Sequence, residues 1–294
     1  FEKCVPIFTN FSYTTFMNNI SSTSVQPTFF YNFDSYQEQL PSSPLLRQYV
    51  SSFYEIITSS SHTYHVPVVP DGCMDIVFVY DGQEVRPFIL KTAETLLGMC
   101  VHPNRYVLGI RFQPVGISKF VRFRSQESES YMLPLYEFLQ RDESVLKSVR
   151  ADIPFGEKCN YLEQFLTHNL IESSTSMDLT FHIANYIIAQ KGQVTIDQIS
   201  KEFFYSPRYI NRLFNDNVGI SPKHFSEIIQ VQNVLLNVQN SSDSLASVAI
   251  ESGYYDQSHM NHIIKKLLHT TSSKLKNNEF FEEVRKDLDE KYIY

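Results

Sequence analysis

Features of membrane-bound and disulfide-stabilised proteins are missing from this sequence. No run of about eighteen apolar residues occurs in the 294 residues, and no segment has the character of a secretory signal. There are four cysteines, without a C-x-x-C pair or the density of a disulfide framework: Cys4, Cys73, Cys100 and Cys159. We therefore expect neither membrane insertion nor secretion, and a cytoplasmic protein with reduced thiols.

Motifs of common enzyme classes are absent as well. The chain has no G-x-S-x-G nucleophile context, no G-x-x-x-x-G-K-[ST] phosphate loop and no G-x-G-x-x-G dinucleotide loop. We therefore expect no catalytic residues, no cofactor and no enzymatic activity. The net charge of −7 also excludes a protein that coats nucleic acid through an overall positive field.

The composition is that of a folded protein with more than one core. A hydrophobic fraction of 43% and a charged fraction of 19% are typical of globular chains. A length of 294 residues is enough for two domains.

A helical unit occurs twice in the C-terminal part of the chain, in residues 194–225 and 244–275. The offset of about fifty residues is the period expected of one supersecondary unit used twice. Between the copies, apolar positions at helical spacing run from Pro222 to about Val238. At about 1.5 Å per residue this linking helix spans roughly 25 Å.

The first copy has the features of two short helices joined by a tight turn. An apolar stripe through Ile196 and Ile199 predicts a supporting helix that ends near Phe203. Ser206 followed by Pro207 predicts a second helix, because the hydroxyl accepts a free backbone amide and proline suits the first helical position. Its outward positions carry hydrogen-bonding side chains: Arg208, Tyr209, Asn211, Arg212 and Asn215. This pattern predicts a helix-turn-helix.

The second copy repeats the plan. Leu245, Val248 and Ala249 form the inner face of the supporting helix, Gly253 supplies the turn and Asp256 is the expected N-cap. The outward positions that follow are Gln257, Ser258, His259, Asn261 and His262.

At these residues the chain resembles the AraC/XylS family of transcription regulators. The first copy matches the family at Ser206, Ile210, Arg212, Phe214, Gly219, Ser221, Pro222 and Phe225. The second keeps Ala249, Gly253, Tyr254, Asp256, Gln257, Ser258, His259, Lys265 and Thr271. The match covers about a third of the chain and is specific, since several fixed spacings agree at once.

The resemblance implies a role for particular side chains. It places Arg208, Asn211 and Arg212 in the DNA major groove, together with all five outward residues of the second copy. We expect Tyr209 and Asn215 to contact DNA as well, which makes ten contact residues. Arginine side chains suit guanine or phosphate, while Asn211 and Gln257 suit adenine edges. RNA polymerase is implied as a further partner.

The second copy departs from the family more than the first. Ile264, His269 and Ser272 stand where the family usually has Phe, Gly and Pro. His262 occupies a position where arginine is frequent, and Gln230 replaces a common linker arginine. We therefore expect the first copy to be the stronger reader of DNA and the second to be a weaker reader or mainly a phosphate contact.

The charge of the helical region is nearly balanced. Residues 178–277 contain nine Lys or Arg and eight Asp or Glu, which leaves +1. DNA binding must then depend on the local placement of charge.

Between Leu45 and about Phe123 the pattern changes to short strands rich in β-branched and aromatic residues. TYHVPVV, MDIVFVY and YVLGIRF are bounded by turn residues, which predicts an antiparallel barrel or sandwich. We expect Leu45–Ile57 to be its first strand and Thr28–Phe33 to be an edge strand in the preceding lead-in. LLRQYVSSFYEI, VPDGCMDIVF and LGIRFQPVG resemble the sensory domain of one branch of the same family, which implies a cupin-like compartment for a small molecule or for dimerisation.

These patterns predict an α+β protein with four segments. They are a partly ordered lead-in at 1–43, a β-rich sensory or dimerisation domain at 44–171, a double helix-turn-helix domain at 178–277, and a charged tail at 278–294. Glu137–Leu170 is expected to be helical and either packs on the β domain or mediates dimerisation.

Two candidate sites lie in the β domain. Arg111, in an alternating strand, either reaches inward to pair with an acidic ligand or pairs with Asp75. Metal-ligand residue types also gather in this region: His62, His65, Asp71, Cys73, Asp75 and His102. Their spacing is not diagnostic, so turn and surface roles are favoured and no metal is predicted.

Three functions are compatible with the sequence. The first is a ligand-responsive, sequence-specific transcription regulator, with double-stranded DNA, a small-molecule effector and a second copy of itself as partners. The second is a β-barrel metal-binding sensor or enzyme whose helical region is an interaction module. The third is a regulator that works through dimerisation without a ligand.

Overall fold

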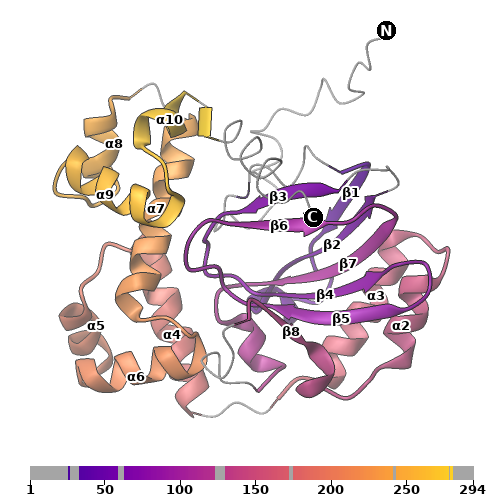
Figure 1. Cartoon of the computed structure of the whole chain (residues 1–294). Coiled ribbons are helices and arrows are strands. Elements are labelled where there is room, and N and C mark those ends of the chain that lie inside the picture. Colours follow the sequence, from indigo (N-terminus) through magenta and orange to yellow (C-terminus); the bar gives the residue numbers. More distant parts are fainter. Residues whose placement is uncertain are drawn as a thin grey trace, which may run out of the picture.

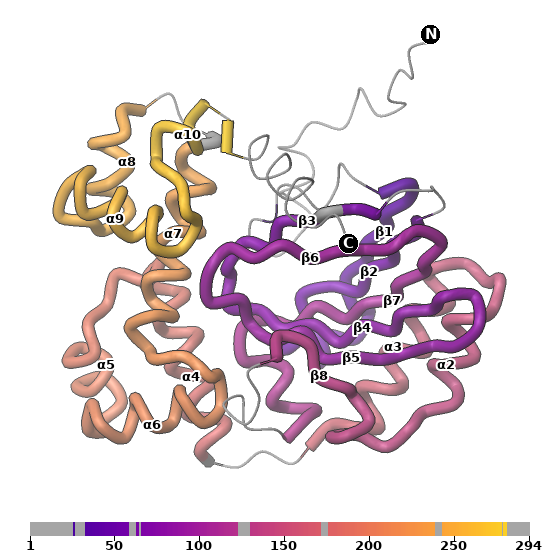
Figure 2. The backbone as a smooth tube through the Cα atoms, viewed as in Figure 1, coloured from indigo at the N-terminus to yellow at the C-terminus, as the bar shows by residue number. Residues whose placement is uncertain are grey.

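The protein has a β-rich N-terminal part and an all-helical C-terminal part (Figure 1). The computed structural model describes residue 26 and residues 33–58, 63–122, 130–171, 175–240, 243–277 and 279–280. The same view as a tube shows the indigo-to-magenta first half forming the sheets and the orange-to-yellow second half forming the separate helical group (Figure 2). The predicted α+β class is confirmed.

The β-rich part consists of two antiparallel sheets. The larger has the strand order β1-β2-β7-β4-β5-β8, and the smaller pairs β3 with β6. The strands are β1 (Ser35–Gln39), β2 (Val50–Thr58), β3 (Tyr64–Val68), β4 (Asp75–Tyr80), β5 (Val85–Leu90), β6 (Leu97–Val101), β7 (Arg105–Phe112) and β8 (Met132–Pro134). Ile110 lies opposite both Phe53 and Ile76, so these three apolar side chains share one face of the large sheet.

Each face of the large sheet is covered by a different layer. Helices α2 (Glu143–Arg150) and α3 (Phe155–His168) pack on one face, where Phe78 meets Phe165 with ring centroids 5.8 Å apart. The β3-β6 pair covers part of the other face, and Val66 packs there in an apolar cluster with the strands of the large sheet. The two sheets pack face to face as in a sandwich, one of the two predicted alternatives, and the helices add a layer on the outer face of the large sheet.

Several predicted boundaries differ from the structure. Leu46–Gln48 form a 3-10 turn, and the strand expected at Leu45–Ile57 begins only at Val50. The first strand among the described residues is β1, which lies inside the segment predicted as lead-in and pairs along β2. Of the edge strand expected at 28–33, residues 28–32 lie outside the described residues.

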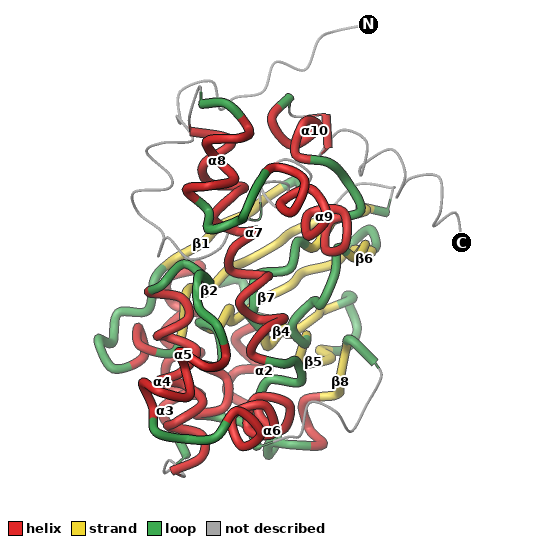
Figure 3. Tube along the Cα trace, turned by 90° about the vertical axis from the view of Figure 1, so that its left-hand side faces the viewer, coloured by secondary structure: helices red, strands yellow, loops and turns green. Residues whose placement is uncertain are grey.

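The helical part contains seven helices among the described residues. They are α4 (Thr175–Ala189), α5 (Ile196–Phe203), α6 (Pro207–Asn217), α7 (Pro222–Asn240), α8 (Leu245–Glu251), α9 (Gln257–Leu268) and α10 (Ser272–Lys276). Turned by 90°, the molecule shows α7 running from the group α4, α5 and α6 to the group α8, α9 and α10 (Figure 3). Among the described residues, no helix has both the length and the apolar character needed to span a lipid bilayer.

All four helices of the two helix-turn-helix units begin at a side-chain cap. Ser206 accepts a hydrogen bond from the Tyr209 amide, and Asp256 accepts one of 2.7 Å from the His259 amide. Thr195 and Gln198 form a reciprocal capping box at the start of α5. The predicted helix starts at Ser206-Pro207 and Asp256 are therefore confirmed.

The two parts share packed contacts. Val69 and Val115 of the β-rich part belong to the same apolar cluster as the cores of α4 to α9. Phe280 is also buried in that cluster, so the packing extends past the predicted domain end at 277.

Candidate nucleic-acid interface

Helix α6 keeps its polar face toward solvent. Its apolar positions, Ile210, Leu213 and Phe214, are buried. Arg208 and Arg212 are exposed, while Tyr209, Asn211 and Asn215 are half-buried. Within the described part of the chain, neither arginine lies in an ion pair, so both charges are available to an anionic partner.

Arg212 is held by a stack of aromatic rings on this face. Its guanidinium lies 5.2 Å from the centroid of the Tyr209 ring. Tyr209 in turn stacks on Tyr205, with ring centroids 5.1 Å apart and planes inclined by 22°. Tyr205 precedes the helix cap and was missed as a site residue by sequence reasoning. The signal that points to it is an aromatic residue directly before the cap serine.

Asn211 is partly engaged within its own helix. One of its side-chain N–H groups donates a 2.8 Å bond to the Pro207 carbonyl. Its carbonyl oxygen and second N–H keep the donor–acceptor pair that an adenine edge requires.

On helix α9, three of the predicted contact residues are exposed and two are half-buried. Ser258, His259 and His262 are exposed, and Gln257 is half-buried. The His259 ring meets the Tyr254 ring edge-on, with centroids 5.5 Å apart. This contact positions the His259 ring at the start of α9 while the ring stays exposed.

Asn261 has a structural role in addition to its predicted one. Its Oδ1 accepts a 2.9 Å hydrogen bond from the Ser272 backbone amide, at the first residue of α10. The acceptor half of this amide is therefore occupied by the fold. Of the ten predicted contact residues, Asn261 is the one with the weakest structural case for reading a base.

Helix α9 is fastened to α7 by a buried carboxylate. The Lys266 ammonium lies 2.6 Å from Glu227, and the His224 ring nitrogen lies 3.6 Å from the same oxygen. Burial raises the pKa of Glu227, but hydrogen bonds from His224 and Lys266 outweigh it and lower the pKa to about 2. Glu227 is thus charged at neutral pH and holds the second helix-turn-helix on the linking helix.

The turns that precede α6 and α9 are exposed and unequal in length. Phe204 has φ of 60° and is 92% exposed, whereas Gly253 has φ of 80° at the corresponding turn. Two residues lie between Gly253 and its cap Asp256, whereas one lies between Phe204 and its cap Ser206. Tyr255 is 89% exposed before α9. Each candidate reading helix is therefore preceded by an exposed aromatic side chain.

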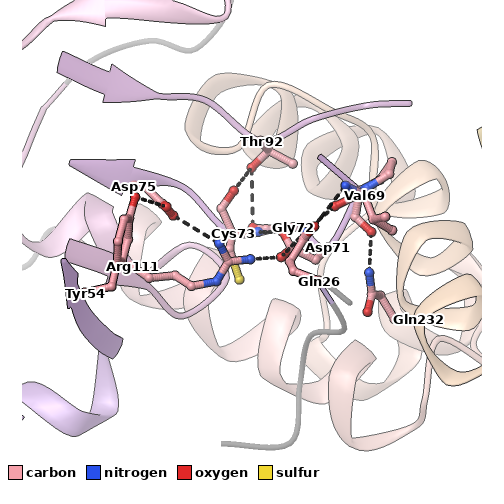
Figure 4. Close-up of polar contacts among 11 residues, drawn as sticks. Gln26, Tyr54, Val69, Asp71, Gly72, Cys73, Asp75, Thr92, Arg111 and Gln232 are labelled. Carbon is pink, nitrogen blue, oxygen red and sulfur yellow. Dashed lines mark hydrogen bonds and ion pairs between the residues drawn. The ribbon is translucent and has the colours of Figure 1, made fainter. Parts of the chain in front are cut away.

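Arg111 lies in a cluster of buried charges in the β-rich part (Figure 4). It forms an ion pair with Asp71 and lies 3.6 Å from Asp75. The Tyr54 hydroxyl donates a 2.8 Å bond to Asp75. The predicted pairing of Arg111 with Asp75 is present, and Asp71 is a second partner that the sequence did not indicate.

The cluster has unusual acid–base properties because it is buried. Burial raises the pKa of Asp75 to about 6, against the opposing effects of Arg111 and the Tyr54 hydrogen bond. Burial lowers the pKa of Arg111, but Asp71 and Asp75 outweigh it and raise the pKa well above its ordinary value. Arg111 therefore stays charged between two acidic neighbours.

The loop that supplies Asp71 also touches the DNA-binding part. Gln232 of α7 donates a 2.7 Å bond to the Pro70 carbonyl. Gly72 has φ of +79°, and an added Cβ would lie 2.6 Å from the Phe225 ring of α7. Residues 69–73, here called the interdomain loop, thus link the charge cluster to α7.

The residue types noted as metal ligands do not converge in the described part of the chain. No group of three or more His, Cys, Asp or Glu there is placed to hold a metal. His62 lies outside the described residues, and Asp71 bonds to the Cys73 amide as a turn residue does.

Two family matches account for most of the described chain. Residues 199–278 match the family Helix-turn-helix domain, and residues 37–132 match the family Domain of unknown function (DUF6597). No curated protein matches the chain significantly.

Similar solved structures include two regulators. The C-terminal domain of AraT, a response regulator from Geobacillus stearothermophilus, is 19% identical at a TM-score of 0.34 and covers 36% of this chain and 88% of its own. ToxT from Vibrio cholerae is 11% identical at a TM-score of 0.41 and covers 82% of this chain and 98% of its own. ToxT with a bound unsaturated fatty acid is 11% identical at a TM-score of 0.40, covering 85% and 96%.

The family match, the repeated cap-and-turn helices and the exposed polar faces agree. Residues 199–278 are an AraC-type helix-turn-helix domain, and the protein is a DNA-binding transcriptional regulator.

Proposed function

We propose that α6 and α9 enter two adjacent major grooves of one duplex, with α7 setting their spacing. The observation that carries this proposal is that both helices expose their polar faces and belong to units joined by the same buried helix. Nineteen residues of α7 correspond to about 28 Å, close to the roughly 34 Å of one DNA turn.

Arg212 is the side chain we propose as the main base contact of α6. It is exposed and oriented by Tyr209, and a guanidinium forms a bidentate pair with guanine. Arg212→Ala should weaken binding to a selected DNA site by about 1–3 kcal/mol and relax the base preference at one position. The measurement is a gel-shift titration with DNA selected from a random library.

A matched variant distinguishes base reading from loss of charge. Arg150→Ala removes one exposed charge from α2, far from α6 in Figure 1. It should leave affinity unchanged. An equal loss for Arg212→Ala on all sequences would make Arg212 a phosphate contact, and no loss would remove it from the interface.

We also propose that the β-rich part makes DNA binding responsive to a small molecule. The support is its buried charge cluster, which touches α7 through the interdomain loop. A thermal-shift screen against metabolites tests it, since a ligand of the native state raises the apparent melting temperature. A homodimer, contact with RNA polymerase and a cytoplasmic location remain parts of the same proposal.

A further inference from the structure

Gln26 places its side-chain amide against the interdomain loop. Its Nε2 donates to the Val69 carbonyl at 2.5 Å and to Asp71 Oδ2 at 3.0 Å. Its Oε1 accepts a 3.0 Å bond from the Val69 backbone amide. A single carboxamide is thus held through both its donor and acceptor sides by residues more than forty positions away in sequence.

The three groups around this amide define what chemistry fits there. The Val69 carbonyl and the Asp71 carboxylate accept hydrogen bonds, while the Val69 amide donates one. A carboxylate would bring oxygens against both acceptors, and an ammonium or amidinium would offer nothing to the Val69 amide. A primary carboxamide, with two N–H donors beside one oxygen acceptor, matches all three groups as Gln26 does, while Arg111 also donates to Asp71.

The surroundings form a partly enclosed cavity. Gln26, Asp71 and Arg111 line it together with apolar side chains such as Leu90 and Met99, and about 20 Å³ remains beside Gln26. That space holds roughly one water molecule. Withdrawal of the Gln26 side chain would enlarge the cavity by the volume of its carboxamide and methylene groups. Polar groups on one side and apolar walls on the other are typical of small-molecule sites.

The same backbone is in contact with the DNA-binding part. Val69 belongs to the apolar cluster of the helical part, and the neighbouring Pro70 carbonyl accepts the bond from Gln232. Gly72 lies against Phe225. A change at the Val69 amide or at Asp71 is therefore next to two contacts with α7, from Pro70 to Gln232 and from Gly72 to Phe225.

We propose that this cavity is a binding site for a small molecule with a primary carboxamide group, and that Gln26 occupies it in the ligand-free chain. Ligand and Gln26 compete for Val69 and Asp71, and the exchange reaches α7 through the interdomain loop. The proposal rests on the ligand response proposed above and names the chemistry of that ligand.

The test uses the full-length chain and two probes of equal size. Propionamide reproduces the end of a glutamine side chain, and propionate replaces its amide by a carboxylate. Both are titrated by NMR into wild type, Gln26→Ala and Gln83→Ala, the last being a matched substitution at an exposed glutamine. Gln26→Ala should bind propionamide at least tenfold more tightly than propionate and at least fivefold more tightly than wild type or Gln83→Ala does.

Equal binding of the two probes, or no gain from Gln26→Ala, would overturn the site. A second test needs no substitution. Saturating propionamide should shift the side-chain amide resonances of Gln26 in wild type toward those of an exposed glutamine, and unchanged resonances would count against the proposal.

Gel shifts separate this inference from the proposed function. Propionamide should change the DNA concentration at half-saturation of Gln26→Ala by at least threefold, and an unchanged value would refute the coupling to α7. If wild type bound no selected DNA at all, the proposed function would fail, while the probe titrations would still decide the site.

Discussion

Phe204 adopts a backbone conformation that suits glycine. Its φ is 60° at the end of α5, and its side chain is 92% exposed. His269 at the end of α9 also has a left-handed backbone, with φ of 55°, at the position where the resemblance expects glycine. The second turn uses Gly253 for the same purpose. An exposed aromatic residue in a left-handed turn costs stability without packing to offset it.

We predict that Phe204→Gly stabilises the protein by about 0.5–1 kcal/mol, because glycine relieves the left-handed strain and little buried surface is lost. Urea unfolding measures it. The reciprocal control is Gly253→Ala, whose Cβ would lie 2.4 Å from the Gln193 side chain and which should destabilise. A loss of stability in Phe204→Gly would show that Phe204 makes a stabilising contact.

Asp75 should make stability depend on pH in an unusual direction. Its folded pKa of about 6 exceeds the ordinary 3.8, so the folded state holds this proton more tightly than the unfolded state does. The resulting stabilisation is present below pH 3.8 and is lost as pH rises through 6. The loss amounts to at most about 3 kcal/mol at roughly 1.4 kcal/mol per pKa unit.

The measurement is the free energy of unfolding at pH 4.5 and 6.5 for wild type and Asp75→Asn. Other carboxylates titrate in both proteins, so the difference between them isolates Asp75. Wild type should lose stability relative to Asp75→Asn as pH rises. A relative gain would mean that pairing with Arg111 dominates over burial.

Residue roles that depend on neighbours in sequence were predictable. The caps Ser206 and Asp256 act on amides three residues away, so local spacing identifies them. The pairing of Arg111 with Asp71 joins residues 40 positions apart and depends on how β7 lies against the interdomain loop. The bond from the Ser272 amide to Asn261 was missed because it joins two different helices, α10 and α9.

At the scale of elements, the interdomain loop contacts α7 directly. The loop offers Gly72 to Phe225 and Pro70 to Gln232. The connection between β5 and β6 adds a 2.7 Å backbone bond from Leu96 to Leu267 at the end of α9. Loops of the β-rich part thus contact both the linking helix and the second helix-turn-helix.

We predict that Gly72→Ala destabilises the protein by about 1–3 kcal/mol more than Gly82→Ala does, because both have positive φ but only Gly72 has a ring against it. An added Cβ at Gly82 meets nothing within 4 Å. Thermal unfolding of both variants measures the difference. Equal losses would show that Phe225 moves away without cost.

Elements were predictable where their pattern was strong. Helices α5, α6, α8 and α9 have clear apolar stripes, and the caps Ser206 and Asp256 placed the starts of α6 and α9. Strand β1, with sequence SYQEQ, is polar and lies at the sheet edge, so its pairing with β2 left no apolar signal. Strand β2 is buried along most of its length and lacks the alternation that separates a strand from other apolar runs.

At the scale of the whole molecule, the helical part is nearly neutral, while the chain as a whole is acidic. With a net charge of −7, long-range attraction to DNA is weak, and affinity must come from contacts at α6 and α9. The position of these helices relative to each other follows from α7, which the β-rich part contacts directly. The number of copies that bind one DNA site was not predictable, because it depends on surfaces between chains.

The central claim is that α6 and α9 read adjacent major grooves of one duplex. Methylation interference on DNA selected from a random library tests it most directly. The account predicts two patches of essential guanines or adenines about one helical turn apart on one face of the DNA. Arg212→Ala should abolish one patch and Gln257→Ala the other. A single patch, or loss of the same patch in both variants, would contradict the account.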